Sequence, residues 1–167
     1  MSFTQSVYHI VFSTKKRIPS INIDKERIVY KILYDLMRKN GAYVYRIGGM
    51  PDHVHILVDI TSKWSLSEFL KKLKQESSYL ISQNGSFVNW NGWEEGYAAF
   101  TYSVKEIPTV INYISNQKEH HKKISFRDEY RDWLIEMGVS PDEPYFPKWP
   151  GSRLPDGKRW WTPLPET

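Results

Sequence analysis

The chain has 167 residues, of which 40% are hydrophobic and 25% charged, a balance typical of one ordinary globular domain. No apolar run approaches the roughly 20 residues that a membrane-spanning helix needs, and the N-terminal segment lacks the pattern of a signal peptide, so we expect a cytoplasmic location. The net charge of +4 does not by itself indicate a nucleic-acid partner, and the absence of cysteine restricts any metal site to nitrogen and oxygen ligands.

The first third of the chain predicts a strand, a helix and a hairpin. β-Branched and aromatic residues over 4–13 indicate a largely buried strand. Apolar residues at helical spacing predict a helix over 24–40, which Gly41 ends. A second strand over 42–47 and a turn over 48–51 then lead into a third strand.

The middle of the chain completes a recognisable order of elements. Ser65 and Glu68 form a capping box that opens a helix over 65–83. A loop over 85–95 and a fourth strand over 96–104 follow. The order β-α-β-β-α-β predicts an α+β, ferredoxin-like fold with an antiparallel sheet, both helices on one face and the other face free.

The C-terminal part predicts two further helices and an extended arm. Pro108 suits the first turn of a helix over 108–123, and a second helix covers 125–138. We predict one domain over 4–140 and a C-terminal arm over 141–167, which is rich in tryptophan and holds seven of the ten prolines.

Two histidines, His53 and His55, share one face of the predicted third strand. Side chains two positions apart on a strand point the same way, and apolar residues occupy the opposite face (Val54, Ile56 and Val58). Two neutral imidazoles held side by side form half of a divalent metal site. The alternative is a partly exposed polar face with no ligand role.

The predicted helix over 108–123 carries Tyr113 and Gln117 one turn apart, with His120 on the same stripe. Two imidazoles and an amide oxygen can bind Mg²⁺ or Mn²⁺ and leave positions open for a phosphate oxygen. Tyr113 is then a candidate nucleophile at phosphorus. Asp52 and His120 are candidates for residues that contact the metal ligands and hold them in position. The alternatives are a turn residue at Asp52 and a histidine that complements the helix dipole at His120.

Basic residues gather in three clusters that lie on or beside predicted elements (15–17, 71–74 and 118–123). With 15% aromatic residues, such clusters can bind phosphates while aromatic rings stack on bases. Solvated helix faces are the alternative for any one cluster. Lys15, Lys16 and Arg17 are our predicted nucleic-acid-binding residues, because they follow the first strand at the edge of the sheet.

Together these motifs resemble the single-tyrosine HUH transposases of small bacterial insertion sequences, the IS200-like and REP-associated type, in which HUH denotes histidine, a hydrophobic residue and histidine. His53-Val54-His55 fits that pattern, and the family's tyrosine and glutamine fall at Tyr113 and Gln117. Further familial segments lie at 69–74, 96–100 and 118–121, and the resemblance covers about 4 to 145. The joint occurrence of these motifs in this order is highly specific.

The resemblance implies more than the residues alone do. It implies that His53, His55 and Gln117 hold a divalent metal, Mg²⁺ or Mn²⁺. Tyr113 would attack single-stranded DNA near a hairpin, keep a 5′-phosphotyrosine and leave a free 3′-hydroxyl. It also implies a homodimer whose sheets join edge to edge, and a tyrosine helix that serves either its own site or that of its partner.

Three alternative functions can be compared with the sequence. A metal-dependent hydrolase of the metallo-β-lactamase pattern needs His-x-His-x-Asp-His, which the residues after His55 do not provide. A non-catalytic nucleic-acid-binding module could use the same fold, as RRM domains do, although their aromatic signature is missing. A domesticated REP-type HUH endonuclease would keep cleavage but serve the host.

Overall fold

The structure is a computed structural model that describes residues 1–124, 126–136 and 138. The predicted C-terminal arm, 141–167, lies outside the described residues. The chain divides into two compact units, Met1–Lys118 and Glu119–Thr167. The single domain predicted over 4–140 thus spans the first unit and part of the second.

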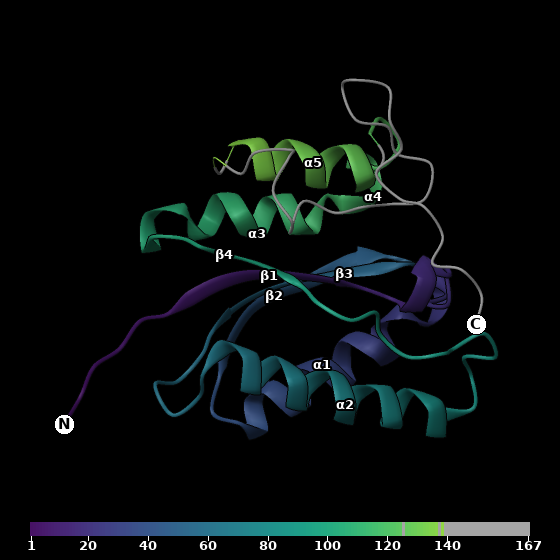
Figure 1. Cartoon of the computed structure of the whole chain (residues 1–167), viewed down its shortest axis with the longest axis horizontal. Coiled ribbons are helices and arrows are strands. Elements are labelled where there is room, and N and C mark those ends of the chain that lie inside the picture. The colour runs from purple at the N-terminus through teal and green to yellow at the C-terminus, as the bar shows by residue number, and fades with distance from the viewer. Residues whose placement is uncertain (125, 137, 139–167) are drawn as a thin grey trace, which may run out of the picture. The chain divides into compact units, whose positions relative to one another are not determined.

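The first unit is built on a four-stranded antiparallel sheet in the order β2-β3-β1-β4. This arrangement confirms the predicted ferredoxin-like α+β fold (Figure 1). Its elements are β1 (Val7–Ser13), α1 (Glu26–Lys39), β2 (Tyr43–Met50), β3 (His53–Asp59), α2 (Leu66–Asn84), β4 (Ala98–Thr101) and α3 (Ile107–Ser115). Short 3-10 turns precede α1 and α3 and follow β1 (Ile23–Lys25, Val104–Glu106 and Lys15–Arg17). Two further helices follow in the chain, α4 (Gln117–His120) and α5 (Phe126–Glu136).

The helix ends follow the local chemistry that the sequence contains. Ser65 caps α2, because its hydroxyl accepts a hydrogen bond from the backbone N–H of Glu68 at 3.2 Å. Gly41 and Gly85, at φ +82° and +74°, adopt the left-handed conformation that ends α1 and α2. The fourth strand is shorter than predicted, since only Ala98–Thr101 pair with β1.

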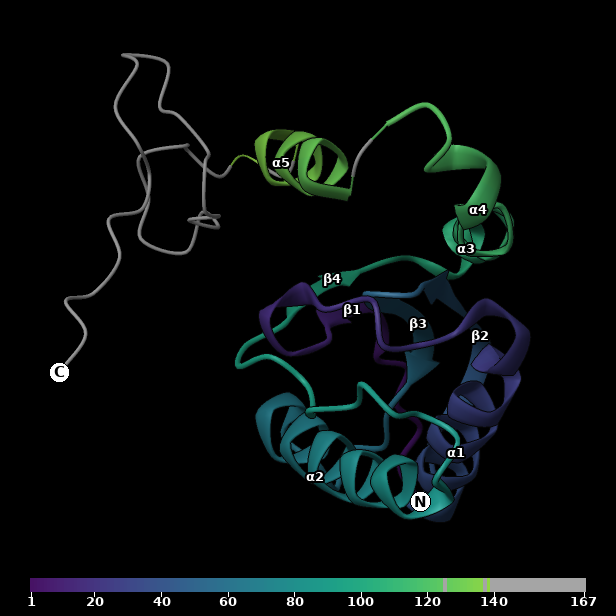
Figure 2. The same cartoon turned by 90° about the vertical axis from the view of Figure 1, so that its right-hand side faces the viewer.

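One face of the sheet packs on α1 and α2, which lie side by side on it (Figures 1 and 2). Alternate residues of β1 and β3 point into this core, and so do the apolar stripes of the two helices. Its fully buried members include Ile10, Ile56, Leu33, Met37 and Leu70. This packing fixes the register of β3 and therefore turns the two histidines to the opposite face.

The opposite face is covered by α3, so the expectation of a free sheet face is wrong. Ile107, Val110 and Ile114 of α3 pack on Val7 and Leu57 of the sheet. Figure 1 shows α3 on the other side of the strands from α1 and α2. A second, smaller apolar core therefore holds the tyrosine helix against the histidine strand.

The helix predicted over 108–123 is interrupted. α3 ends at Ser115, and Asn116 leaves the helical conformation at φ −101° and ψ 17° before α4 begins at Gln117. The Asn116 N–H still donates to the carbonyls of Asn112 and Tyr113, which closes the last turn of α3. His120 therefore does not continue the stripe of Tyr113. Within the described part of the chain, no helix is both long and apolar enough to cross a membrane.

Candidate active site

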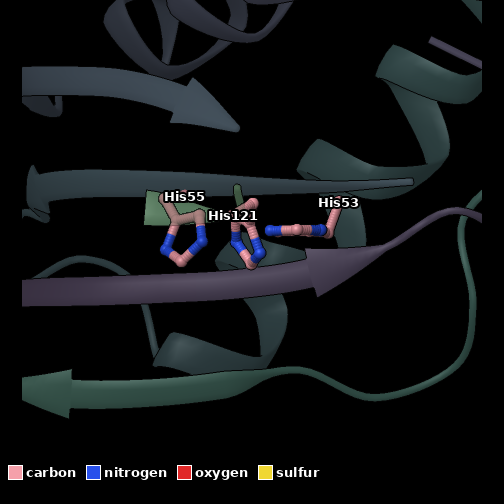
Figure 3. A group of neighbouring side chains, drawn as sticks. All are labelled: His53, His55 and His121. Atoms are coloured by element: carbon pink, nitrogen blue, oxygen red, sulfur yellow. The ribbon is translucent and has the colours of Figure 1, made fainter. Parts of the chain in front are cut away.

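β3 presents His53 and His55 on the face that α3 covers. Both side chains are buried, at 1% and 0% exposure, and their ring centroids lie 5.1 Å apart. Figure 3 shows the two imidazoles projecting from this strand. The arrangement follows from strand parity, because Val54 and Ile56 point into the α1–α2 core.

Asp52 and Arg17 fix the orientation of His53. The His53 Nδ1 lies 2.7 Å from Asp52 Oδ1, and Arg17 donates to the other carboxylate oxygen at 2.7 Å. Burial opposes ionisation of Asp52, but the hydrogen bond from His53 and the nearby Arg17 bring its pKa down to about 2. Burial lowers the pKa of His53, against the opposing effect of Asp52. The proton between His53 and Asp52 therefore lies on His53 Nδ1, and the imidazole is neutral. The lone pair on His53 Nε2 is then a potential metal ligand.

His9 on β1 contacts His55 as Asp52 contacts His53, through the Nδ1 atom of the ring. Its Nε2 lies 2.9 Å from His55 Nδ1, and the two rings stack with centroids 5.2 Å apart. His9 is buried at 2% exposure, and burial lowers its pKa to about 4, so the ring is neutral at pH 7. His9 is not among the site residues predicted from the sequence. The alternation of side chains along β1 gives the face on which His9 lies. Its contact with His55, however, depends on the register in which Val11 pairs with His55, and the sequence does not give that register.

Tyr113 and Gln117 come to the histidines from the end of α3 and the start of α4. The Tyr113 ring centroid lies 5.9 Å from that of His55 and 6.1 Å from that of His9, edge-on to both. Gln117 is buried at 1% exposure, and the interaction of its side chain with His53 acts to raise the pKa of that histidine against the effect of burial. The structure thus brings His53, His55, Tyr113 and Gln117 of one chain together.

Comparison with known proteins identifies the family of this chain. The model of the IS200-like transposase family matches residues 2–117. The chain belongs to the IS200-like transposase family. It is 32% identical over 120 residues to the transposase for insertion sequence element IS200 of Salmonella typhimurium, a match that covers 69% of this chain and 78% of that protein. It is 28% identical over 120 residues to the ISDra2 transposase TnpA of Deinococcus radiodurans, covering 69% and 86%.

A solved structure shares the fold of this transposase. The REP-associated tyrosine transposase bound to a REP hairpin superimposes with a TM-score of 0.56 and covers 95% of each chain. Sequence identity is only 12%, so this similarity concerns the fold. Because it belongs to the IS200-like transposase family, the chain is an enzyme of the transposase class, as the sequence predicted.

The remaining predicted site residues of the transposase have other contacts. His120 is in the second unit, where its Nε2 lies 3.4 Å from Glu129 Oε1. His121, also labelled in Figure 3, belongs to the same unit and contacts Glu129 Oε2 at 2.9 Å. Lys15 and Lys16 form an exposed turn after β1, whereas the guanidinium of Arg17 is engaged by Asp52.

Gly48 permits the close approach of α3 to β2 beside the site. It pairs with His55 in the sheet, and a Cβ at this position would lie 2.7 Å from the Ile114 carbonyl oxygen. We expect Gly48→Ala to lower the free energy of unfolding by about 1–3 kcal/mol and to displace the chain that carries Tyr113 and Gln117. Urea unfolding checks the stability.

Thr109→Ala, an exposed change on α3, is the control for Gly48→Ala. It should leave the unfolding curve within about 0.5 kcal/mol of the wild type. Unchanged stability in Gly48→Ala would show that the end of α3 adjusts freely to a methyl group.

Proposed function

We propose that this transposase cleaves and rejoins single-stranded DNA at hairpin ends through a 5′-phosphotyrosine on Tyr113. The observation that carries the proposal is the packing of Tyr113 against His55, which itself lies beside His53 in the same chain. A nucleophile beside a set of potential metal ligands is the arrangement that phosphoryl transfer without ATP requires.

The residues present fit a divalent metal such as Mg²⁺ or Mn²⁺. His53 and His55 each use Nδ1 in a contact with a neighbouring group, which points Nε2 of both rings toward the ligand role. Gln117 adds an amide oxygen, and this nitrogen and oxygen set suits a metal that keeps open positions. When bound, the metal would polarise a phosphate oxygen and offset the charge that develops on it.

The chain's own residues supply the covalent step. The Tyr113 oxygen forms a bond to phosphorus as the bond to the 3′-oxygen of the preceding nucleotide breaks. The phenolic proton is lost, and the departing 3′-oxygen takes up a proton. The bond energy stays in the phosphotyrosine, so a 3′-hydroxyl of another strand can reverse the reaction and release the tyrosine. Burial of the site by α3 keeps water from competing with that hydroxyl.

DNA hairpins and a second copy of the chain are the proposed partners. The solved relative that shares this fold is described as bound to a REP hairpin. The sheet ends in β2 and β4, and either edge offers backbone groups for the edge-to-edge homodimer that the family resemblance implies.

The test uses single strands copied from the DNA on both sides of the gene that encodes the chain, labelled at the 5′ or the 3′ end. With Mg²⁺ or Mn²⁺, a denaturing gel should show a covalent protein–DNA adduct that carries the label 3′ of the nick. The same sequences as duplexes, or with EDTA, should give none. Binding without any adduct in either metal would support the non-catalytic nucleic-acid-binding module instead.

A domesticated REP-type endonuclease differs only in its cellular role. Both the mobile and the host-serving enzyme should form the adduct. Excision of the surrounding DNA as a circle in cells would favour the transposase of a mobile element.

A further inference from the structure

We propose that a cleft along the β2 edge of the sheet holds the single-stranded DNA that runs into the cleavage site. The inference rests on the proposed function, since it names the path of that substrate. The cleft has a volume of about 560 Å³ and is lined by α1, by β2 and by the chain from Ile114 to Lys118. All of these residues belong to the first unit.

The cleft leads directly to the candidate active site. Gly48 lines it and is paired with His55 across the sheet. Gln117, whose side chain interacts with His53, also lines it. A strand in this cleft would therefore present its backbone next to the proposed metal ligands.

Positive charge dominates the cleft. Arg27 and Lys31 line it from α1, and Arg46 lines it from β2. Its acidic residue, Glu26, is neutralised by Lys118, whose Nζ lies 2.6 and 2.8 Å from the two carboxylate oxygens. Lys31 is paired with Asp35 at 2.7 Å.

Arg27 and Arg46 remain the cations available to a ligand. Both side chains are exposed, and neither forms an ion pair with another residue in the described part of the chain. Two guanidinium groups along a cleft match the phosphates of a DNA backbone, which each can bind through paired N–H donors.

Aromatic rings line the same cleft as these cations. Tyr30 and Tyr34 line the cleft from α1, and Tyr34 is 44% exposed. Tyr45 lines it from β2 at a β-bulge, where the pairing with β3 skips from Val44 to Arg46. The bulge allows Tyr45 and Arg46, which are adjacent in sequence, to serve the same cleft. Arginine and tyrosine side by side are the groups that track a backbone and stack on bases.

A second copy of the chain is the competing occupant, because β2 is an edge strand. In a two-fold contact the same surface of both copies is used, so two patches of net positive charge would be brought together. The charge of the cleft therefore favours DNA.

The experiment measures binding of fluorescein-labelled (dT)16 by fluorescence anisotropy in EDTA, in which no cleavage occurs. Arg27→Gln/Arg46→Gln should bind more weakly, and the slope of log K against log[salt] should fall by about 1.4 in magnitude, as expected for two lost phosphate contacts on a single strand. Tyr34→Leu should weaken binding about five-fold or more while the salt slope stays unchanged.

Lys39→Gln/Lys63→Gln, which removes two exposed charges outside the cleft, is the matched control and should keep the wild-type slope. Wild-type affinity and slope in both cleft variants would overturn the inference. So would a change of oligomer mass in light scattering without a change in (dT)16 binding, which would assign the cleft to a contact between copies. Weakened binding in the variants, together with a wild type that forms no adduct on hairpin DNA, would uphold the cleft and reject the proposed cleavage.

Discussion

Tyr113→Phe should abolish the covalent adduct with single-stranded DNA while leaving DNA affinity within about two-fold of the wild type. The substitution removes only the hydroxyl oxygen that would bond to phosphorus. The ring should keep its edge-on packing against His55 and His9. Adduct yield on a denaturing gel, with Mn²⁺ present and DNA saturating, checks the prediction.

Tyr79→Phe is the matched control for Tyr113→Phe, because it removes the hydroxyl of an exposed tyrosine on α2. It should form the adduct at the wild-type rate. An adduct that persists in Tyr113→Phe would assign the nucleophile to another residue. Loss of DNA binding in that variant would mean that the hydroxyl supports the substrate surface and not only the chemistry.

His9→Leu should weaken Mn²⁺ binding about 10- to 100-fold, the range found when a group that orients a metal-binding histidine is removed. The reason is geometric. His9 Nε2 lies 2.9 Å from His55 Nδ1, and an acceptor there keeps the proton on Nδ1 and the Nε2 lone pair toward the metal. His9→Gln offers an amide oxygen in place of the ring nitrogen and should restore most of the affinity. Titration of free Mn²⁺ by electron paramagnetic resonance measures this directly, without a cleavage assay.

Val7→Ala is the control for the effect of His9→Leu on packing. Val7 is buried on the same face of β1 and has no polar role. We expect it to lower the free energy of unfolding by about 1–3 kcal/mol and to leave Mn²⁺ affinity unchanged. Equal Mn²⁺ affinity in His9→Leu and the wild type would mean that His9 only packs in the core and does not orient His55. If His9→Gln does not recover Mn²⁺ affinity, the shape of the His9 side chain matters to the site and its hydrogen bond to His55 does not.

Several features could be predicted because they depend on residues close together in the chain. The alternation of a strand places His53 and His55 on one face whatever that strand pairs with. The N-cap serine at Ser65 and the glycine at Gly85 set the limits of α2 through a local hydrogen bond and backbone conformation. The order of elements then limits the topology to a few arrangements, of which the ferredoxin-like sheet is observed.

Other features could not be predicted because they depend on contacts between distant segments. Arg17 was predicted to bind nucleic acid, yet its guanidinium lies on Asp52, 35 residues away in sequence. Asn116 interrupts the predicted long helix, although the residues on both sides continue the helical pattern. Helical periodicity places side chains on a stripe only while the backbone stays helical, and for that reason His120 leaves the stripe of Tyr113.

The sequence by itself determined that two imidazoles share a strand face, that no thiolate can hold a metal, and that a tyrosine and a glutamine lie four residues apart. Only the tertiary structure decided what surrounds them. The register of β1 against β3 places His9 beside His55, and the missing side chain of Gly48 lets the end of α3 approach the sheet. Register and close packing are properties of paired segments, whose partners local sequence does not specify.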